Sequence, residues 1–170
     1  MIQAIETRYN GYRFRSRLEA RWAIFLDTLN IGYRYEHEGF DIDNTWYLPD
    51  FWLPRFDLWI EIKPTLDDMA GMGKAVALSQ QIEGPVVILI GSPWPGEYIA
   101  AHCRKGENGG VRCIPDCQWS ECSQCGSLGL ASRETPNFIC LSGCSERTPT
   151  TIPSQRLMQA YAAARQARFE

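Results

Sequence analysis

Two carboxylates and a lysine in the stretch 47–64 are the residues of this chain best suited to chemistry on a phosphate. Asp50 comes first, and Glu61 and Lys63 follow after ten intervening residues. Carboxylate oxygens are preferred ligands of Mg²⁺ and Mn²⁺, and an ammonium group can neutralise charge that develops on a phosphate. These three side chains therefore form a candidate site for a divalent cation and a phosphate, provided that the chain brings them together.

The intervening residues predict a β-hairpin that brings them together. Residues 51–53 and 58–63 are rich in aromatic and β-branched side chains, and a proline and an aspartate mark a turn over residues 54–57. Because side chains alternate along a strand, Glu61 and Lys63 would share one polar face, and the apolar side chains between them would face a core. A short hairpin would also carry the aspartate at its start close to this glutamate and lysine.

The order Pro49-Asp50, followed by Glu61-Ile62-Lys63, resembles the signature of the PD-(D/E)XK nucleases, a superfamily of restriction-endonuclease-like enzymes. The resemblance runs from about Tyr9 to Ile90. Within the superfamily, this stretch resembles the small nucleases of phages and mobile elements, such as transposon end-cleaving endonucleases and Holliday-junction resolvases. The activity that this resemblance implies is hydrolysis of DNA phosphodiester bonds, leaving a 5′-phosphate and a 3′-hydroxyl.

The same resemblance assigns roles to the candidate residues. In the superfamily the aspartate and the glutamate hold Mg²⁺ or Mn²⁺, which implies Asp50 and Glu61 here, with the main-chain carbonyl of Ile62 as a further ligand. The lysine of the signature, Lys63, would position or deprotonate the attacking water. Many members add a glutamate from the first helix, and Glu19 has the matching place.

A helix is predicted from Ser16 to about Leu29, because apolar residues recur along one face at helical spacing. Ser16 and Glu19 also form a capping-box pattern, in which the glutamate bonds the start of the helix, so a structural role for Glu19 stays open. Arginines around the helix start are candidates for contacts with a nucleic-acid backbone, and the alternative is a solvated helix face. These arginines are Arg13, Arg15, Arg17 and Arg21.

The order of the predicted elements indicates an α/β fold with a mixed sheet. A helix, three strands that begin at 33–38, a second helix at about 67–81 and a buried strand at 85–91 follow one another. This order resembles the restriction-endonuclease-like core. We expect a nuclease core over residues 1–97, further strands with a Cys-rich zinc-binding segment over 98–147, and a linker with a C-terminal helix over 148–170.

Six of the seven cysteines lie between residues 113 and 144, which predicts a metal site rather than disulfides in a compartment that keeps thiols reduced. The four predicted ligands are Cys122, Cys125, Cys140 and Cys144. The first pair forms a Cys-x-x-Cys-Gly knuckle, and the second pair begins after a further fourteen residues. Four thiolates hold Zn²⁺ in a closed tetrahedral site, which is a structural geometry. Cys117 is a rival ligand, and the choice stays open.

Charge is distributed unevenly along the chain. The net charge of −3 gives no overall signal for nucleic acid, but residues 1–35 contain six arginines against three acidic residues. Residues 36–63 contain seven acidic residues against two basic ones. An arginine-rich entry beside an acidic pocket suits a DNA backbone that metal ions bridge to the protein. No targeting or membrane-spanning stretch is evident, so we expect a protein in the cytoplasm of a bacterium or of a phage-infected host cell.

DNA is the expected partner, no membrane partner is expected, and a homodimer or a larger recombination, defence or transposition complex is compatible with a nuclease. Two other classes stay open. One is a non-catalytic nucleic-acid-binding protein that retains the nuclease fold, and the other is a zinc-ribbon interaction protein whose N-terminal part is a scaffold. The presence of Lys63 favours the enzyme, because simple binding does not require a lysine at that place.

Overall fold

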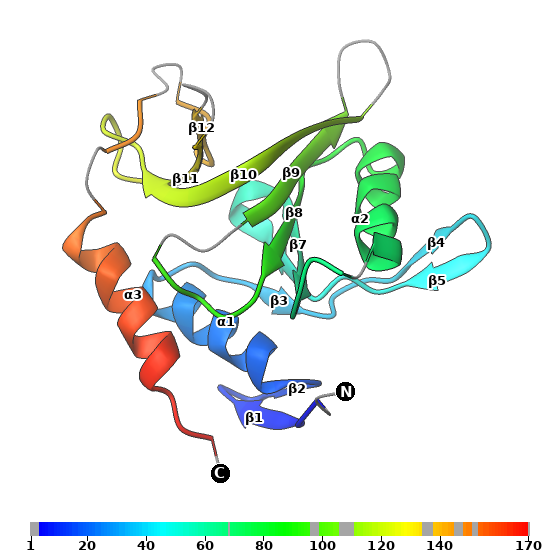
Figure 1. The fold of residues 1–170 in the computed structure, drawn as a ribbon, viewed down its shortest axis with the longest axis horizontal. Helices are drawn as coiled ribbons and strands as arrows, with labels where there is room; N and C mark the ends of the chain where they lie inside the picture. The colour runs from blue at the N-terminus through cyan, green and yellow to red at the C-terminus, as the bar shows by residue number, and fades with distance from the viewer. Residues whose placement is uncertain are drawn as a thin grey trace.

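The computed structural model describes residues 4–67, 69–95, 99–105, 111–133, 138–144, 148–150 and 153–169. Its centre is a mixed β-sheet of eight described strands (Figure 1). In sheet order these are β12 (Phe138–Cys140), β11 (Leu128–Ser132), β10 (Val111–Glu121), β9 (Ile99–Lys105), β8 (Val86–Ile90), β7 (Leu58–Lys63), β6 (Phe51–Leu53) and β3 (Arg34–Tyr35). β7 and β8 run parallel, and the other neighbouring strands run antiparallel.

Helices cover both faces of this sheet (Figure 1). α1 (Arg17–Thr28) and α3 (Gln155–Gln166) pack together on one face, and α2 (Met69–Gln81) covers the other. Two small hairpins lie outside the sheet, β1 (Thr7–Tyr9) with β2 (Tyr12–Phe14), and β4 (Phe40–Ile42) with β5 (Thr45–Tyr47). The predicted mixed α/β architecture is confirmed. Over the part of the chain that the structure describes, no helix is long and apolar enough to cross a membrane.

The central hairpin forms where the sequence predicts it. β6 and β7 pair antiparallel with Phe51 opposite Ile60, and a 3₁₀ helix, η1 (Pro54–Phe56), connects them. The chain reverses at Asp57, which has a left-handed φ of 46°. Aspartate adopts this conformation more readily than most residues, because its short side chain can bond the local backbone. The reversal brings the start of β6 beside the end of β7.

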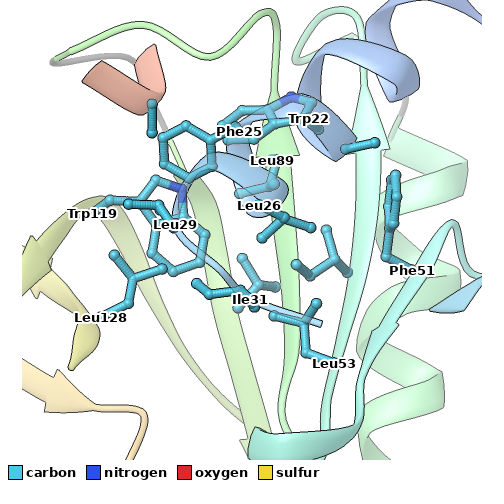
Figure 2. Close-up of a cluster of buried hydrophobic side chains, with 14 of the residues drawn as sticks. Trp22, Phe25, Leu26, Leu29, Ile31, Phe51, Leu53, Leu89, Trp119 and Leu128 are labelled. Atoms are coloured by element: carbon cyan, nitrogen blue, oxygen red, sulfur yellow. The ribbon is translucent and has the colours of Figure 1, made fainter. Parts of the chain in front are cut away.

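Both faces of this hairpin are interior surfaces. Ile60 and its apolar neighbours face α1 and α3, and Trp59 packs with Ala75 and Leu78 of α2. The face of β7 that carries Trp59, Glu61 and Lys63 is therefore largely covered by α2. Figure 2 shows the α1 side of the core, with the labelled side chains Trp22, Phe25, Leu26, Leu29, Ile31, Phe51, Leu53, Leu89, Trp119 and Leu128.

Helix α1 begins and ends close to its predicted bounds. Ser16 is its N-cap, and the Ser16 Oγ accepts a hydrogen bond from the Glu19 amide at 3.2 Å. Further along α1, the Trp22 Nε1 donates to the carbonyl oxygen of Gly91 at 2.9 Å. Because Gly91 directly follows β8, this bond fixes the first turns of α1 over the ends of the central strands.

Local backbone turns explain where the structure departs from the predicted strands. The strand predicted at 33–38 is limited to β3, because Glu36 has a φ of 45° and turns the chain. The Asn10-Gly11 and Asp43-Asn44 turns each connect two short strands that the sequence did not indicate. All four turn residues have positive φ, as tight hairpin turns require.

The Cys-rich part continues the same sheet, since β9 pairs with β8. The predicted C-terminal helix is confirmed as α3, which Ser154 caps and which packs on α1. Within the predicted linker, residues 148–150 lie along the edge of β10, where the Thr150 amide donates to the Glu121 carbonyl at 2.9 Å. Residues 145–147 and 151–152 lie outside the described residues. The domain boundaries after residues 97 and 147 stay a prediction.

Candidate functional site

The hairpin brings the predicted aspartate, glutamate and lysine to one end of β6 and β7. Asp50 directly precedes β6, so the pairing of Phe51 with Ile60 places Asp50 opposite Glu61. The Asp50 Oδ2 accepts the main-chain amide of Ile62 at 2.7 Å. The Lys63 Nζ lies 2.7 Å from the Glu61 Oε1. One hydrogen bond, from the Ile62 amide to Asp50, and one ion pair, between Lys63 and Glu61, thus order the three candidate residues of the hairpin.

Glu61 is held by a neutral hydroxyl group and by a charged ammonium group. Its Oε2 accepts a hydrogen bond from the Tyr47 hydroxyl at 2.7 Å, and its Oε1 pairs with Lys63. The side chain of Glu61 is buried, with 6% of its surface exposed, and that of Lys63 is 15% exposed. A buried carboxylate with a fixed orientation and a nearby ammonium suits a site that holds and neutralises a charged ligand.

Glu19 lies at the start of α1 and accepts hydrogen bonds at both oxygens. The Ser16 hydroxyl donates to its Oε1 at 2.6 Å, and the Tyr35 hydroxyl donates to its Oε2 at 2.6 Å. The Arg15 amide also donates to the Oε2 at 3.0 Å. Glu19 therefore caps the start of α1, a role that the sequence left open. It accepts hydrogen bonds from the Ser16 hydroxyl and from the Arg15 amide. A catalytic role for Glu19 stays a prediction.

Arg15 has a role in this site that the sequence did not indicate. Its Nη2 lies 3.1 Å from the Asp50 Oδ1, and its Nε lies 2.5 Å from the Glu36 Oε1. Arg15 was predicted as a DNA contact and Glu36 was not singled out. The only signal in the sequence was the position of Arg15 just before the helix that carries Glu19, because the partners come from distant turns.

Two tyrosines were also missed by sequence reasoning. Tyr47 fixes Glu61 and Tyr35 fixes Glu19, each through a hydroxyl group that donates to a carboxylate oxygen. Neither residue belongs to the signature, and their partners lie 14 and 16 positions away along the chain. Their contribution is to hold the two glutamates in one orientation.

The three carboxylates crowd one another electrostatically. Burial raises the pKa of Asp50 well above its ordinary value, and the charges of Glu61 and Glu19 raise it further. The Ile62 amide and the Arg15 guanidinium act in the opposite direction but do not reverse the shift. A raised carboxyl pKa means that the site favours additional positive charge. A bound cation would supply that charge and reverse the shift.

The residues present fit a divalent cation in their chemistry. The predicted ligands are two buried carboxylates and the main-chain carbonyl of Ile62, which are hard oxygen donors of the kind that Mg²⁺ and Mn²⁺ take. Among the described residues, however, no group of three acidic side chains brings ligand oxygens within 4.8 Å of one another. Glu19 therefore does not converge with Asp50 and Glu61 on one point in this conformation.

The four predicted DNA-contact arginines have different environments. Arg13 forms an exposed ion pair with Glu6, and Arg17 is exposed on the first turn of α1. Arg21 donates to the carbonyl oxygens of Ala164 and Arg165 at 2.7 and 2.8 Å, at the end of α3. Arg21 thus joins α1 to α3. Contact of these arginines with DNA stays a prediction.

A cavity of about 380 Å³ opens beside this polar site. Glu19 and Ile62 contribute to its wall, so the cavity reaches both the helix and the strand of the candidate site. The lining residues are Ala4, Ile5, Ser16, Arg17, Leu18, Glu19, Ile62 and Pro64. Part of a ligand larger than a metal ion can therefore lie against the site from this side.

The four cysteines predicted as zinc ligands form one cluster. The sulfur atoms of Cys122, Cys125, Cys140 and Cys144 all lie within 4.8 Å of one another, and Cys125 and Cys140 are 3.5 Å apart. Sulfurs in a tetrahedral zinc site with Zn–S of about 2.3 Å lie about 3.8 Å apart. Four cysteines at these separations can hold a structural metal ion such as zinc.

Sheet pairing and two tight turns build the cluster. The Gly126 amide donates to the Cys122 carbonyl at 2.8 Å, and the Gly143 amide donates to the Cys140 carbonyl at 3.0 Å. Both glycines have positive φ, which a residue with a β-carbon rarely adopts. The two turns meet because β11 and β12 pair, with Gly129 opposite Cys140.

The thiol groups also indicate a cation site by their mutual influence. The amide of Ser127 and the neighbouring thiols lower the pKa of Cys125 to about 7, so this residue forms a thiolate readily. Hydrogen bonding to Cys125 raises the pKa of Cys144 to about 12. Without a metal ion, the first thiolate to form makes ionisation of the next thiol less favourable, and a bound dication removes this repulsion.

Cys117 lies outside this cluster. It is buried in the main core with Trp119 and the residues of α1, and it is 1% exposed. The sequence could not separate it from the other cysteines, because its spacing from Cys122 is compatible with a ligand. Its position on β10, before the turn, explains why its side chain belongs to the core.

Comparisons of this chain with protein-family models, with curated proteins and with solved structures find no match.

Proposed function

We propose that this protein is a metal-dependent endonuclease of the PD-(D/E)XK type, which hydrolyses phosphodiester bonds of DNA. The observation that carries the proposal is the hairpin that joins Asp50, Glu61 and Lys63. The Ile62 amide bonds Asp50 at 2.7 Å, and Lys63 lies 2.7 Å from Glu61. These are the residue types, in the order and on the elements, that the resemblance to these nucleases requires. The order α1, β3, β6, β7, α2, β8 further supports a restriction-endonuclease-like core.

In this proposal Asp50, Glu61 and the carbonyl of Ile62 hold Mg²⁺ or Mn²⁺. Such a cation, when bound, polarises the scissile phosphate and lowers the pKa of the attacking water. Tyr47 keeps Glu61 in the orientation that a ligand needs, through its hydroxyl group at 2.7 Å. Burial of both carboxylates excludes bulk water, which strengthens their attraction for a cation.

Lys63 has two tasks in the proposed reaction. Its ammonium group orients the attacking water, and it neutralises the negative charge that develops on the phosphate in the transition state. Its pairing with Glu61 keeps the flexible side chain at the site before substrate arrives. Glu19 assists from α1, and the cavity beside it offers space for the nucleotides next to the scissile bond.

A substrate panel tests the proposed function. Supercoiled plasmid, linear duplex, single-stranded and branched DNA are incubated with the protein in Mg²⁺, Mn²⁺ or EDTA. We expect cleavage of at least one substrate with Mg²⁺ or Mn²⁺, and none with EDTA. Asp50→Asn and Lys63→Ala should each reduce the rate about 1,000-fold, since each removes charge stabilisation of the transition state.

A matched control separates these effects from general damage. Asp43→Asn removes one carboxylate at the tip of the exposed β4–β5 hairpin, away from β7. This variant should cleave like the unaltered protein. Cleavage that survives in purified Asp50→Asn and Lys63→Ala, or that continues in EDTA, would show that another site or a contaminant is responsible.

A second function is favoured by one observation. Within the described residues, the cysteine cluster is the only group of three or more His, Cys, Asp or Glu ligand atoms that lie within 4.8 Å of one another. A zinc-ribbon interaction protein, or a non-catalytic nucleic-acid-binding protein with this fold, would need that site alone. DNA binding without cleavage under every metal condition would support the nucleic-acid-binding class. Zinc content without DNA affinity at low salt would support the interaction protein.

A further inference from the structure

Arg15 lies against the Asp50 oxygen to which a metal ion could bind. One oxygen of Asp50, Oδ2, is held by the Ile62 amide at 2.7 Å. The other oxygen, Oδ1, faces the Arg15 Nη2 at 3.1 Å. The main chain thus holds one oxygen of the carboxylate, while an exposed side chain covers the other. A metal ion bound at the Oδ1 of Asp50 would take the place of Arg15.

The exposure of the two partners differs greatly. The Asp50 side chain is 6% exposed, and the Arg15 side chain is 55% exposed. The guanidinium can therefore leave Asp50 without first crossing the protein interior, whereas the carboxylate cannot follow it. Loss of this partner leaves a buried carboxylate that needs another cation.

Glu36 holds Arg15 close to the site by a separate ion pair. Its Oε1 lies 2.5 Å from the Nε of Arg15. Glu36 follows β3 with a φ of 45°, and its amide donates to the Asp50 carbonyl at 2.9 Å. A non-glycine residue in this conformation is uncommon and often serves a site. The turn fixes the glutamate beside Asp50, so the arginine has an anchor that does not depend on Asp50.

The shape of the guanidinium permits an exchange of partners. Its donors lie on different edges of one plane, so the Nε can stay on Glu36 while the Nη groups change partner. A phosphate oxygen is the natural alternative, because guanidinium and phosphate form paired hydrogen bonds. The three buried carboxylates, Glu19, Asp50 and Glu61, also favour a further cation beside Arg15, because their charges repel one another.

We propose that Arg15 is an exchangeable counter-ion of the acidic site. In the protein without a divalent cation at the acidic site, Arg15 is the partner of Asp50. When a divalent cation binds there, Arg15 stays anchored to Glu36 and turns its Nη groups to a phosphate of the nucleic acid. This inference rests on the proposed nuclease function for its second half. The first half, competition between Arg15 and a cation, concerns this chain alone.

Manganese binding tests the competition without reference to activity. The full-length, zinc-loaded protein is titrated with Mn²⁺, and free Mn²⁺ is followed by electron paramagnetic resonance. Arg15→Gln should bind Mn²⁺ about fivefold more tightly than the unaltered protein, since the ion pair between Arg15 and Asp50 no longer competes. Arg15→Lys should lie between the two, because a lysine keeps the charge but cannot contact Asp50 and Glu36 together.

The control is Arg13→Gln, which removes the same charge two positions earlier, from an exposed pair with Glu6. Its Mn²⁺ affinity should equal that of the unaltered protein. Unchanged or weaker Mn²⁺ binding in both Arg15 variants would overturn the proposal. If Arg15→Gln fails to fold, as judged by thermal unfolding of the zinc-loaded protein without added Mn²⁺, the result for Arg15→Lys decides.

Nucleic-acid binding tests the second half. In a Lys63→Ala background, which should not cleave, DNA affinity is measured with and without Mn²⁺. Arg15→Gln should weaken the Mn²⁺-dependent part of DNA binding about fivefold, because one charged contact to phosphate is lost. Undiminished binding would overturn this half. Tighter Mn²⁺ binding by Arg15→Gln in a protein that cleaves no substrate would retain the competition and reject the proposed nuclease.

Discussion

The acidic site and the cysteine cluster are both candidate metal sites, but they differ in what surrounds the ligand atoms. The sulfurs of the cluster lie within 4.8 Å of one another, so each thiol has other thiols as its near neighbours. The carboxylates of the acidic site are instead partnered by Arg15, Lys63 and the hydroxyls of two tyrosines.

This difference distinguishes a resident ion from an exchangeable one. Thiolates this close to one another repel, so a metal ion would stabilise the cluster by neutralising them. Carboxylates that already have an arginine and a lysine nearby depend less on a metal ion, although their mutual repulsion still favours one. We therefore expect zinc to stay bound through purification, and Mg²⁺ or Mn²⁺ to bind weakly and reversibly.

The largest effect should follow from the loss of the cysteine site. Cys140→Ser removes one ligand from β12, and the zinc content should fall from one ion per chain to near zero. The thermal unfolding midpoint should decrease by at least about 10 °C, because structural zinc contributes directly to folding. Zinc by elemental analysis and unfolding by circular dichroism measure these effects.

Cys117→Ala is the matched variant for this prediction. It removes a thiol from the main core, where Cys117 is 1% exposed. Its zinc content should stay at one ion per chain even though a core cavity lowers its stability. Loss of zinc from Cys117→Ala with retention in Cys140→Ser would exchange the roles assigned to the two residues.

The pH dependence of stability, measured without Mg²⁺ or Mn²⁺, should show whether the pKa of Asp50 is raised. Its pKa in the folded protein is raised above the ordinary value of 3.8. The folded state therefore holds a proton that the unfolded state loses, and stability falls as the pH rises from about 4 through the raised pKa. Asp50→Asn keeps a neutral side chain, so its free energy of unfolding relative to the unaltered protein should increase across this window.

Thermal unfolding of the zinc-loaded protein at several pH values, without added Mg²⁺ or Mn²⁺, measures this difference. Saturating Mn²⁺ should reduce it for the unaltered protein, because a bound cation favours the ionised carboxylate. A difference between the two proteins that is independent of pH would contradict a raised pKa. A difference of opposite slope would indicate that Arg15 and the Ile62 amide outweigh burial.

A smaller effect is expected at Tyr47. Tyr47→Phe removes the hydroxyl that donates to the buried Glu61 at 2.7 Å, which should cost about 1–2 kcal/mol in the free energy of unfolding. Cleavage should slow without being abolished, because Glu61 and Lys63 remain. Tyr12→Phe, which removes a hydroxyl from a partly buried tyrosine of β2, should change neither quantity measurably. Equal effects of the two substitutions would deny Tyr47 a role at Glu61.

The sequence predicts best the features that short-range patterns determine. The turn at 54–57 and the β-branched strand after it define the central hairpin, and Ser16 defines the start of α1. The cysteine knuckle is also local, because its glycine at position 126 supplies the positive φ that the turn requires. In each case residues a few positions apart decide the structure.

The parts of the site that the sequence did not predict depend on contacts between distant segments. The partners of Arg15 are Asp50, 35 positions away, and Glu36. Glu36 reaches it only because a left-handed turn ends β3, and no pattern at residues 33–38 indicates such a turn. The burial of the β7 face that carries Glu61 was not predicted for a related reason, because the packing of α2 against it is a tertiary contact.

Anomalous diffraction from crystals of the zinc-loaded protein soaked in Mn²⁺ would test the contrast between the two sites most directly. Data at the zinc and manganese absorption edges assign each metal separately. We predict zinc among Cys122, Cys125, Cys140 and Cys144, and manganese between Asp50 and Glu61 with Arg15 moved off Asp50. Manganese absent from Asp50 and Glu61 at saturating concentration, with Arg15 still paired to Asp50, would contradict the account.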